Sequence, residues 1–402
     1  MGGGRHYYAI FLFEYTMQYL AKHLSIWFST HARDLLWRHD VTPYRVWVSE
    51  IMLQQTQVAT VTPYFERWMR VFPTLEALAE AEESDVMSLW AGLGYYRRAR
   101  YLHRGAKFVV ENLHGVFPSD IAELKKIPGI GDYTSGAIAS IALGQDVPAI
   151  DGNVERVLGR YFAIFGDLKG GDARKKLERY AQGIAKCGNA GVVNQALMDL
   201  GASFCGKKAD CEACPLKAKC AAYAENLTAE LPQRAVRAAK QMSWQSALFL
   251  VDDDMQLLLV RRNASGLLGG LWSLPMMPLC ADTPRSEAEA ALYARASRFP
   301  AWSAWLVDHN LQNNVQSCLP TGSFVRHIFT HIDMRVTLDV AHYRGAFSNM
   351  PKTLDNDDLF DRIDVVTLRG DVSDFSDHPI STLIKKLLKH VNDIQKSQRS
   401  LF

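Results

Sequence analysis

Four cysteines fall within sixteen consecutive residues of this 402-residue chain, in the spacing Cys205-x5-Cys211-x2-Cys214-x5-Cys220. Free cysteines do not usually gather at ligand spacing, and so short a stretch can enclose one metal centre without closing a long loop. Structural zinc sites usually show two close cysteine pairs, whereas this cluster has one Cys-x-x-Cys pair, so the spacing favours an iron–sulfur cluster. Zinc stays open as the alternative, and four buried structural cysteines are the third interpretation.

The remaining cysteines, Cys187, Cys280 and Cys318, are scattered, and the total of seven is odd. A secreted disulfide framework is therefore not expected. The apolar run 7–13 ends at Glu14. It is far shorter than the ~20 residues that span a bilayer, and no small-residue cleavage site follows it. These features predict a soluble protein of a reducing compartment, without a membrane partner.

The formal net charge of +2 does not by itself indicate a nucleic-acid partner. The charge is unevenly divided, because residues 1–240 carry 29 basic and 25 acidic side chains (+4), and the rest carry 16 and 18 (−2). Lysines 207, 208, 217 and 219 lie within or beside the cysteine cluster. They form either a basic surface for phosphates or a solvated face.

From about residue 21 to residue 223 the apolar residues recur every three or four positions, which predicts a mostly helical region. Thr42-Pro43 and the pair Asp120 and Glu123 are typical helix starts. Residues 226–243 contain few large apolar side chains, and we interpret them as a linker. The β-like runs 246–251 and 256–261 and an alternating stretch within 324–339 then predict a mixed α/β domain.

Residues 120–142 predict a helix, a tight turn over 127–131 and a second helix. Gly129 and Gly131 permit a backbone that a side chain would block. A turn that leads into a helix can direct main-chain N–H groups at a DNA phosphate without reading the base. A purely structural helical hairpin is an equally good interpretation.

Two carboxylates are candidate catalytic groups. Glu50 lies in a predicted helix, 44–58, whose apolar stripe would surround it and raise its pKa, as a general acid requires; Gln54 and Gln57 are expected on the same face. Asp151 follows an apolar run and precedes a helix that starts near Val154. Its simplest interpretation is a helix cap.

Five segments in order resemble the MutY-type adenine DNA glycosylase family: 47–58 (WVSEIMLQQTQV), 92–100 (GLGYYRRAR), 127–138 (IPGIGDYTSGAI), 149–160 (AIDGNVERVLGR) and the cysteine cluster. The match covers about residues 24–223. The resemblance implies a helix–hairpin–helix, Gly/Pro-Asp glycosylase fold that excises adenine mispaired with 8-oxoguanine or guanine. It also implies a 4Fe-4S cluster on the four cysteines, although the first gap has five residues where the family more often has six.

The resemblance also implies residue roles. Glu50 would protonate the adenine, and Asp151 would stabilise the developing oxocarbenium sugar, a division of labour known from glycosidases. Gln55 and Tyr95 would fill or wedge the opened duplex, although Tyr95 has an ordinary core aromatic as its alternative. Thr56 would lie near the oxidised guanine.

Tyr133 and Asn153 would position groups around the reacting sugar. Bifunctional relatives that resemble endonuclease III carry a lysine at the position of Tyr133, and its amine forms a Schiff base with the sugar. Tyrosine cannot do so, which predicts a monofunctional glycosylase. The alternatives are a bifunctional glycosylase/lyase on oxidised pyrimidines and a non-enzymatic DNA-binding module with a structural metal.

Residues 246–277 resemble the opening of the Nudix-like domain that recognises 8-oxoguanine in this family, with a looser match over about 240–390. Phe329-Thr330-His331 resembles the family's Phe-Ser-His loop. Only Glu287 and Glu289 follow Pro275 where a Nudix hydrolase needs a run of glutamates with an arginine to hold magnesium, so pyrophosphatase activity is not expected.

The expected fold is multidomain: an all-α helix–hairpin–helix glycosylase domain with an iron–sulfur loop, and a C-terminal α/β Nudix-like domain. The expected boundaries are an N-terminal extension (1–20), the helical domain (21–225), the linker (226–243), the Nudix-like domain (244–390) and a tail (391–402). The helical domain would combine a six-helix module (about 38–150) with an iron–sulfur subdomain built from 21–37 and 151–225. We expect a monomer that acts on double-stranded DNA containing A:8-oxoguanine or A:G pairs, in a bacterial cytoplasm at the nucleoid.

Overall fold

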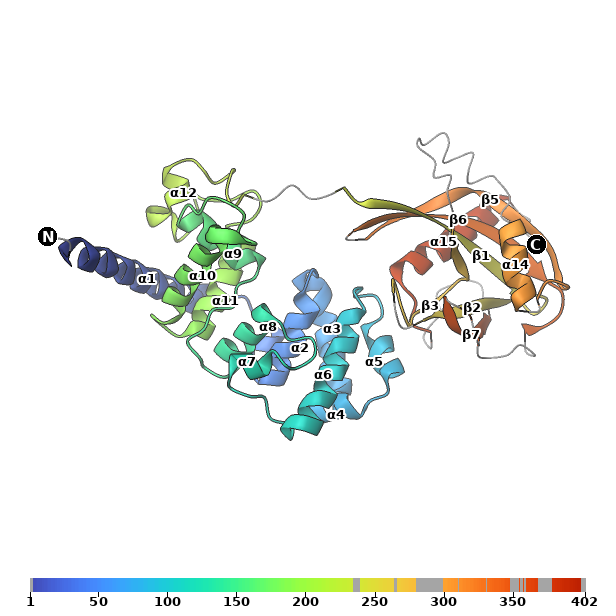
Figure 1. Cartoon of the computed structure of the whole chain (residues 1–402), viewed down its shortest axis with the longest axis horizontal. Helices are drawn as coiled ribbons and strands as arrows, with labels where there is room; N and C mark the ends of the chain where they lie inside the picture. Colours follow the sequence, from blue (N-terminus) through green and yellow to red (C-terminus); the bar gives the residue numbers. More distant parts are fainter. Residues whose placement is uncertain are drawn as a thin grey trace. The chain divides into compact units, whose positions relative to one another are not determined.

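A computed structural model describes residues 3–233, 239–263, 266–279, 299–309, 311–329, 331–347, 354, 357, 359–367 and 378–398 (Figure 1). Thr330, Glu287, Glu289 and Cys280 lie outside the described residues. The chain divides into two compact units, Met1–Leu89 with Arg97–Val236, and Trp90–Tyr96 with Arg237–Phe402. Within the described residues, no helix is both long and apolar enough to cross a membrane.

The first unit is built from helices. In chain order they are α1 (Gly3–His31), the 3-10 turn η1 (Leu36–Arg38), α2 (Pro43–Leu53), α3 (Val58–Val71), α4 (Leu75–Glu80), α5 (Glu83–Trp90), α6 (Arg97–Leu113), α7 (Ile121–Leu124), α8 (Asp132–Ala137), the π-helical turn η2 (Ile138–Ala142), α9 (Gly152–Tyr161), α10 (Gly171–Ala185), α11 (Ala190–Ser203), η3 (Lys217–Lys219) and α12 (Ala221–Ala224). The prediction of a helical region is confirmed.

Both predicted helix starts are present. The hydroxyl of Thr42 accepts a hydrogen bond of 3.2 Å from the amide of Arg45, and Pro43 occupies the first turn of α2. The carboxylate of Asp120 accepts a hydrogen bond of 3.0 Å from the amide of Glu123 at the start of α7. In each case a side chain satisfies an amide that has no partner inside the helix.

The helix predicted over 44–58 is wrong at its C-terminal end. It stops at Leu53, because Gln54 leaves the helical region with a ψ of 112° and Gln55 has a positive φ of 58°. The next helix begins at Val58. Gln54 and Gln57 therefore flank a turn and do not continue the helical face that carries Glu50. The physical cause is a distant side chain, because Arg98 of α6 binds the carbonyls of Ile51, Met52 and Gln54, which would otherwise accept hydrogen bonds from the amides of a longer helix.

Helices from the beginning and from the end of the helical unit's sequence share one hydrophobic core. Side chains of α1 are buried together with those of α9, α10 and α11 and with Leu216. The predicted subdomain of 21–37 and 151–225 thus shares a single core. The boundary expected at residue 20 falls inside α1, where Met17 and Leu20 belong to this core and are fully buried.

Much of the expected linker packs on the helical unit. Leu231 is buried, and its carbonyl accepts a hydrogen bond of 2.8 Å from Nε of Arg160. The side-chain oxygen of Gln233 accepts a hydrogen bond of 2.7 Å from the amide of Gly166. The strand that opens the second unit starts at Gln241. The connecting segment is therefore shorter than 226–243.

Over its described residues, the second unit is a seven-stranded sheet with helices on its faces. Its elements are β1 (Gln241–Asp252), β2 (Gln256–Arg262), β3 (Trp272–Ser273), β4 (Met276–Pro278), α14 (Phe299–Asp308), β5 (Val315–Ile328), β6 (Ile332–Tyr343), β7 (Phe360–Thr367) and α15 (Thr382–Gln398). The order is β3-β2-β1-β6-β5, while β4 pairs with β1 and β7 with β2. Strands β1 and β6 are parallel, and the other pairs are antiparallel.

Alternate residues of β1 enter two cores. Phe249 packs with side chains of α15, whereas Leu248 packs with Trp302 of α14. This is the mixed α/β domain that the sequence predicts, and the runs 246–251 and 256–261 are confirmed as parts of β1 and β2. The alternating stretch 324–339 is divided between β5 and β6.

Candidate active site

The helical unit contains a cleft of about 870 Å³. Four of the predicted site residues line it: Glu50 from α2, Tyr133 from α8, and Asp151 and Asn153 from the start of α9. Gln55 and Thr56, in the turn between α2 and α3, line it as well. A concave site that gathers ionisable side chains from several elements is the usual form of an active site.

Glu50 is buried, with 6% of its surface exposed. Burial raises the pKa of its carboxyl group from the usual 4.5 to about 7, and the charge of Asp151 adds to the rise. A hydrogen bond from the Tyr133 hydroxyl to Oε2 and the charge of Arg38 act in the opposite direction. Glu50 can therefore hold a proton near neutral pH and release it to a bound group.

Asp151 is a helix cap whose hydrogen bonds favour its charged form. Oδ1 accepts hydrogen bonds of 2.9 Å and 2.7 Å from the amides of Asn153 and Val154. Oδ2 accepts a hydrogen bond of 2.7 Å from Nδ2 of Asn153. Burial raises the pKa of Asp151, and these three bonds oppose the rise. Asp151 therefore caps the N-terminus of α9 and also lines the cleft, so the helix-cap interpretation and the catalytic interpretation are compatible.

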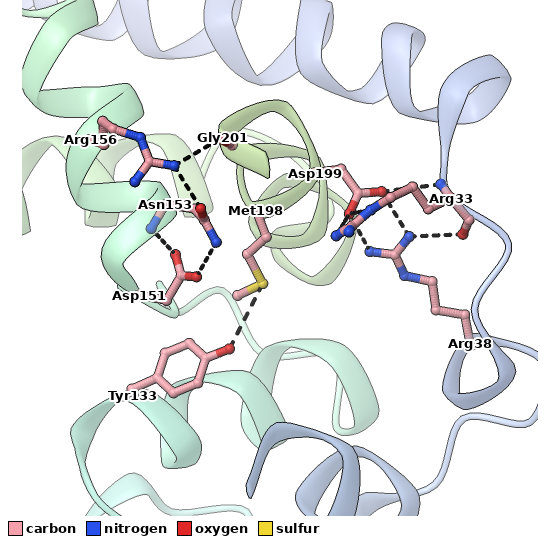
Figure 2. Close-up of polar contacts among 9 residues, drawn as sticks. All are labelled: Arg33, Arg38, Tyr133, Asp151, Asn153, Arg156, Met198, Asp199 and Gly201. Atoms are coloured by element: carbon pink, nitrogen blue, oxygen red, sulfur yellow. Dashed lines mark hydrogen bonds and ion pairs between the residues drawn. The ribbon is translucent and has the colours of Figure 1, made fainter. Parts of the chain in front are cut away.

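The phenol of Tyr133 is affected by the charges of both carboxyl groups. Burial and the charges of Glu50 and Asp151 keep the pKa of its phenol well above 10. The phenol is therefore a neutral hydrogen-bond donor, not a nucleophile. Its hydroxyl also lies 3.9 Å from Sδ of Met198, a residue of α11 (Figure 2).

Arg156 joins Asn153 to the loop of the cysteine cluster. Nη2 donates hydrogen bonds of 2.8 Å to Oδ1 of Asn153 and of 2.7 Å to the carbonyl of Gly201 (Figure 2). Nε donates to the carbonyl of Cys205. Because Asn153 also holds Asp151, one guanidinium connects the first cysteine to the candidate catalytic carboxylate. No local sequence pattern singled out Arg156, although it lies within the motif 149–160.

A second arginine group at the cleft was also missed. Asp199 is fully buried and binds both Arg33 and Arg38, with 2.8 Å from Arg33 Nε to Oδ1 and 2.8 Å from Arg38 Nη1 to Oδ2 (Figure 2). Both arginines line the cleft, as does Gln195. These bonds hold the pKa of Asp199 below its usual range despite burial. Asp199 lies more than 160 residues from Arg33 in the chain, so no local pattern could reveal the group.

The predicted DNA-binding turn has the geometry that requires glycine at one position. Gly129 has a φ of +88°, and a Cβ there would lie 2.8 Å from Cβ of Tyr101. Gly131 is the cap of α8 and has open space around it. Tyr95 also has a positive φ, 50°, and is 49% exposed. Tyr95 is not among the residues that line the cleft.

The four clustered cysteines are free and line one pocket beside α9 and α11. Among the residues that the structure describes, no three His, Cys, Asp or Glu side chains lie close enough together to hold a metal ion. The donor set nevertheless suits one, because Nη1 of Arg160 lies 3.4 Å from Sγ of Cys205 and would offset thiolate charge. Burial raises the pKa of the Cys214 thiol to about 11, so a metal must displace its proton on binding.

In the second unit, the turn that resembles the Phe-Ser-His loop joins β5 to β6. The amide of Phe329 donates a hydrogen bond of 2.8 Å to the carbonyl of Ile332. The Phe329 carbonyl accepts a hydrogen bond of 2.9 Å from Nζ of Lys240, and the His331 carbonyl accepts one of 3.0 Å from the amide of Gln241. His331 is exposed. Hydrogen bonds to the main chain thus hold Phe329 and His331, whereas Thr330 lies outside the described residues.

Comparisons with known proteins agree with the two units. Residues 48–184 match the family model of HhH-GPD superfamily base excision DNA repair proteins, and residues 246–390 match that of the NUDIX domain. The chain therefore combines a helix–hairpin–helix base-excision-repair domain with a Nudix-like domain.

The curated relatives identify the family of the chain more specifically. The chain is 35% identical to the mouse adenine DNA glycosylase over 364 residues, which is 77% of this chain and 68% of that protein. It is 36% identical to the Arabidopsis thaliana adenine DNA glycosylase over 78% of this chain, but spans only 55% of that protein. The chain belongs to the adenine DNA glycosylase family. A solved structure described as a thermostable thymine-DNA glycosylase aligns over 52% of this chain and 97% of its own, with 26% identity and a TM-score of 0.47.

Proposed function

We propose that this protein removes adenine mispaired with 8-oxoguanine or guanine from double-stranded DNA, by hydrolysis of the N-glycosidic bond. The observation that carries the proposal is the pair of carboxyl groups in one cleft. Burial raises the pKa of Glu50 to about 7. Burial also raises the pKa of Asp151, but there three hydrogen bonds that favour the anion oppose the rise. Such a pair provides an acid and a carboxylate for one reaction.

The adenine must first leave the base stack, at a cost of a few kcal/mol. Glu50 then gives its proton to a ring nitrogen of the adenine. The bond between the base and C1′ breaks, and its electron pair leaves with the neutral adenine. Asp151 stabilises the positive charge that develops on the sugar, and a water molecule adds to C1′ while losing a proton, so that an abasic site remains.

Three further residues position these groups. Tyr133 donates a hydrogen bond to Glu50 and thereby fixes the orientation of the acid. Asn153 donates to Asp151 and is itself held by Arg156. Lys169 also lines the cleft, but its Nζ forms an ion pair of 2.8 Å with the buried Glu155. We therefore infer a monofunctional glycosylase, because a Schiff base needs a neutral amine at the sugar.

The same proposal includes a 4Fe-4S cluster on Cys205, Cys211, Cys214 and Cys220. Thiolate ligation of a cluster would staple the loop that follows α11 into one conformation. Iron and acid-labile sulfide measured on protein purified without oxygen test this assignment. Zinc in place of both elements would contradict it.

DNA recognition would be divided between the two units. Gly129 and Gly131 would place main-chain amides against a phosphate, whereas Gln55, Thr56 and Tyr95 would enter the opened duplex. Phe329, Thr330 and His331 would distinguish 8-oxoguanine from guanine. We place the protein, as a monomer, in a bacterial cytoplasm at the nucleoid.

The decisive experiment measures adenine release under single-turnover conditions from duplexes that differ only in the base opposite adenine: 8-oxoguanine, guanine or thymine. Release is expected from the first two and not from the third. Glu50→Gln should lose release while it still binds the A:8-oxoguanine duplex, because glutamine is nearly isosteric but has no proton to give. Release by this variant would refute the acid. No adenine release from the A:8-oxoguanine or A:G duplex by the parent protein would refute the proposed substrate.

A further inference from the structure

The turn 54–57 lines the cleft in a backbone conformation that is unfavourable for most residues. Gln55 has a φ of 58°, a left-handed conformation that few residues other than glycine adopt. Such backbone persists only where surrounding contacts hold it. Gln55 and Thr56 both line the cleft.

The contacts that come from outside the turn include four hydrogen bonds from one side chain of α6. Arg98 is buried, with 9% of its surface exposed. Its Nη1 donates hydrogen bonds to three main-chain carbonyls, at 2.8 Å to Ile51, 3.0 Å to Met52 and 2.6 Å to Gln54. Its Nη2 donates a hydrogen bond of 3.3 Å to Oγ1 of Thr56. The guanidinium therefore contacts the chain on both sides of Gln55.

The chemistry of these acceptors explains why an arginine is needed. The last carbonyls of α2 have no partner inside the helix and carry its partial negative charge. Ile51 and Met52 supply two of them, directly after Glu50. A planar guanidinium offers five donors in a fixed fork, whereas a lysine ammonium is a compact point charge that cannot reach the same set.

Thr56 completes the arrangement. Its hydroxyl accepts from Arg98 and donates a hydrogen bond of 3.3 Å to the carbonyl of Gln54. Its amide donates a hydrogen bond of 3.2 Å to the carbonyl of Leu53. Arg98 and Thr56 thus share Gln54 as an acceptor, and together they close the turn around Gln55.

We propose that Arg98 is a positioning residue that presets the turn 54–57 in the shape in which Gln55 and Thr56 meet the DNA. The part that concerns DNA rests on the proposed function. A turn that is already ordered loses less conformational entropy when the duplex binds, so more of the binding energy is left to open the base pair. Arg98 acts through these residues and does not touch the reacting atoms.

The test compares Arg98→Lys with Arg104→Lys, which changes an exposed arginine of the same helix. Hydrogen exchange of the peptide 51–58, measured on the full chain without DNA, should become faster in Arg98→Lys only. With 2-aminopurine in place of the target adenine, the fluorescence gain on extrusion should fall. The single-turnover rate of adenine release should drop by about 100-fold, the scale of an ångström-level misplacement.

The pH profile separates positioning from a general loss of structure. Arg98 is not among the groups that shift the pKa of Glu50. The alkaline limb of the rate profile should therefore keep its midpoint in Arg98→Lys. The proposal would be overturned if hydrogen exchange of the peptide 51–58 and extrusion of the base in Arg98→Lys equalled those of the parent protein. A shifted midpoint of the alkaline limb in this variant would also overturn it.

A second pair of variants covers the case in which Arg98→Lys does not fold. Thr56→Val keeps the shape of the side chain but removes the oxygen that binds Arg98, whereas Thr56→Ser keeps it. Exchange of the peptide 51–58 should be faster in Thr56→Val than in Thr56→Ser, and equal exchange would overturn the proposal. If the parent protein releases no adenine, the proposed function fails, while the exchange measurements still decide the role of Arg98.

Discussion

The hydroxyl of Tyr133 donates a hydrogen bond to Oε2 of Glu50, and this bond works against the burial that raises the pKa of the carboxyl group. The two effects leave the pKa of Glu50 at about 7. A general acid is most useful when its pKa lies near the working pH, because it is then often protonated and still gives up its proton readily. Tyr133 therefore lowers the pKa of Glu50 and orients its carboxyl group, as the proposed role of a general acid requires.

Tyr133→Phe should move the alkaline limb of the pH–rate profile to higher pH. The lost hydrogen bond lowers the pKa of Glu50 in the parent protein, so its removal raises that pKa further. The absolute rate should fall, because the acid is then less firmly oriented. Single-turnover adenine release measured from pH 5 to pH 9 tests this, and a limb that moves to lower pH would show that another group controls it.

Glu50→Gln should stabilise the fold more as the pH rises. In the parent protein the folded state binds the Glu50 proton more tightly than the unfolded state, since the pKa rises from 4.5 to about 7 on folding. Its contribution to stability is thus complete below about pH 4.5 and is lost as the pH rises through about 7. The variant should gain relative to the parent across this window, by roughly 3 kcal/mol at most. Urea unfolding at pH 5 and pH 8 measures the gain, and an equal difference at both values would contradict it.

Borohydride should trap no covalent adduct between the parent protein and its DNA product. The phenol of Tyr133 stays neutral, and an amine would be needed for a Schiff base. Tyr133→Lys should allow trapping if the side chain at this position lies next to the sugar. Lys169→Met serves as the control for the lysine at the cleft. A high yield of adduct from the parent that disappears in Lys169→Met would identify Lys169 as a lyase residue.

Local patterns in the sequence predict local structure well. Thr42 and Asp120 begin helices as expected, because a helix cap depends on a few neighbouring residues. The runs that form β1 and β2 are also recognised from their alternation and bounding turns. The raised pKa of Glu50 follows from its apolar neighbours on α2, and the structure bears this out.

Contacts between distant segments explain what the sequence could not predict. The helix that carries Glu50 ends early because Arg98, more than 40 residues later, takes the carbonyls of Ile51, Met52 and Gln54. The spacing of apolar residues along the sequence cannot reveal such a contact. The same is true of Asp199, which binds Arg33 and Arg38 across more than 160 residues.

Replacing Thr330 and His331 by alanine should reduce the discrimination between adenine opposite 8-oxoguanine and adenine opposite guanine. Phe329 and His331 are held through their main chain, by hydrogen bonds with Ile332, Lys240 and Gln241, so the support that the structure describes does not depend on the side chain of His331. The ratio of the two single-turnover rates measures the effect. Equal losses on both substrates would assign the turn to general DNA binding.

Arg156→Gln should slow adenine release without loss of iron. Arg156 donates hydrogen bonds to Oδ1 of Asn153, which in turn holds Asp151, and to the main-chain carbonyl of Cys205, which is not a metal ligand. A charge-assisted hydrogen bond is worth about 1.5–3 kcal/mol, so the rate should fall by about 10- to 100-fold. Arg160→Gln is the matched variant, because Arg160 lies beside Sγ of Cys205 and donates to the carbonyl of Gly206 at 2.7 Å. It should lower the iron content, whereas iron loss from Arg156→Gln at an unchanged rate would show that Arg156 serves the cysteine loop and not the active site.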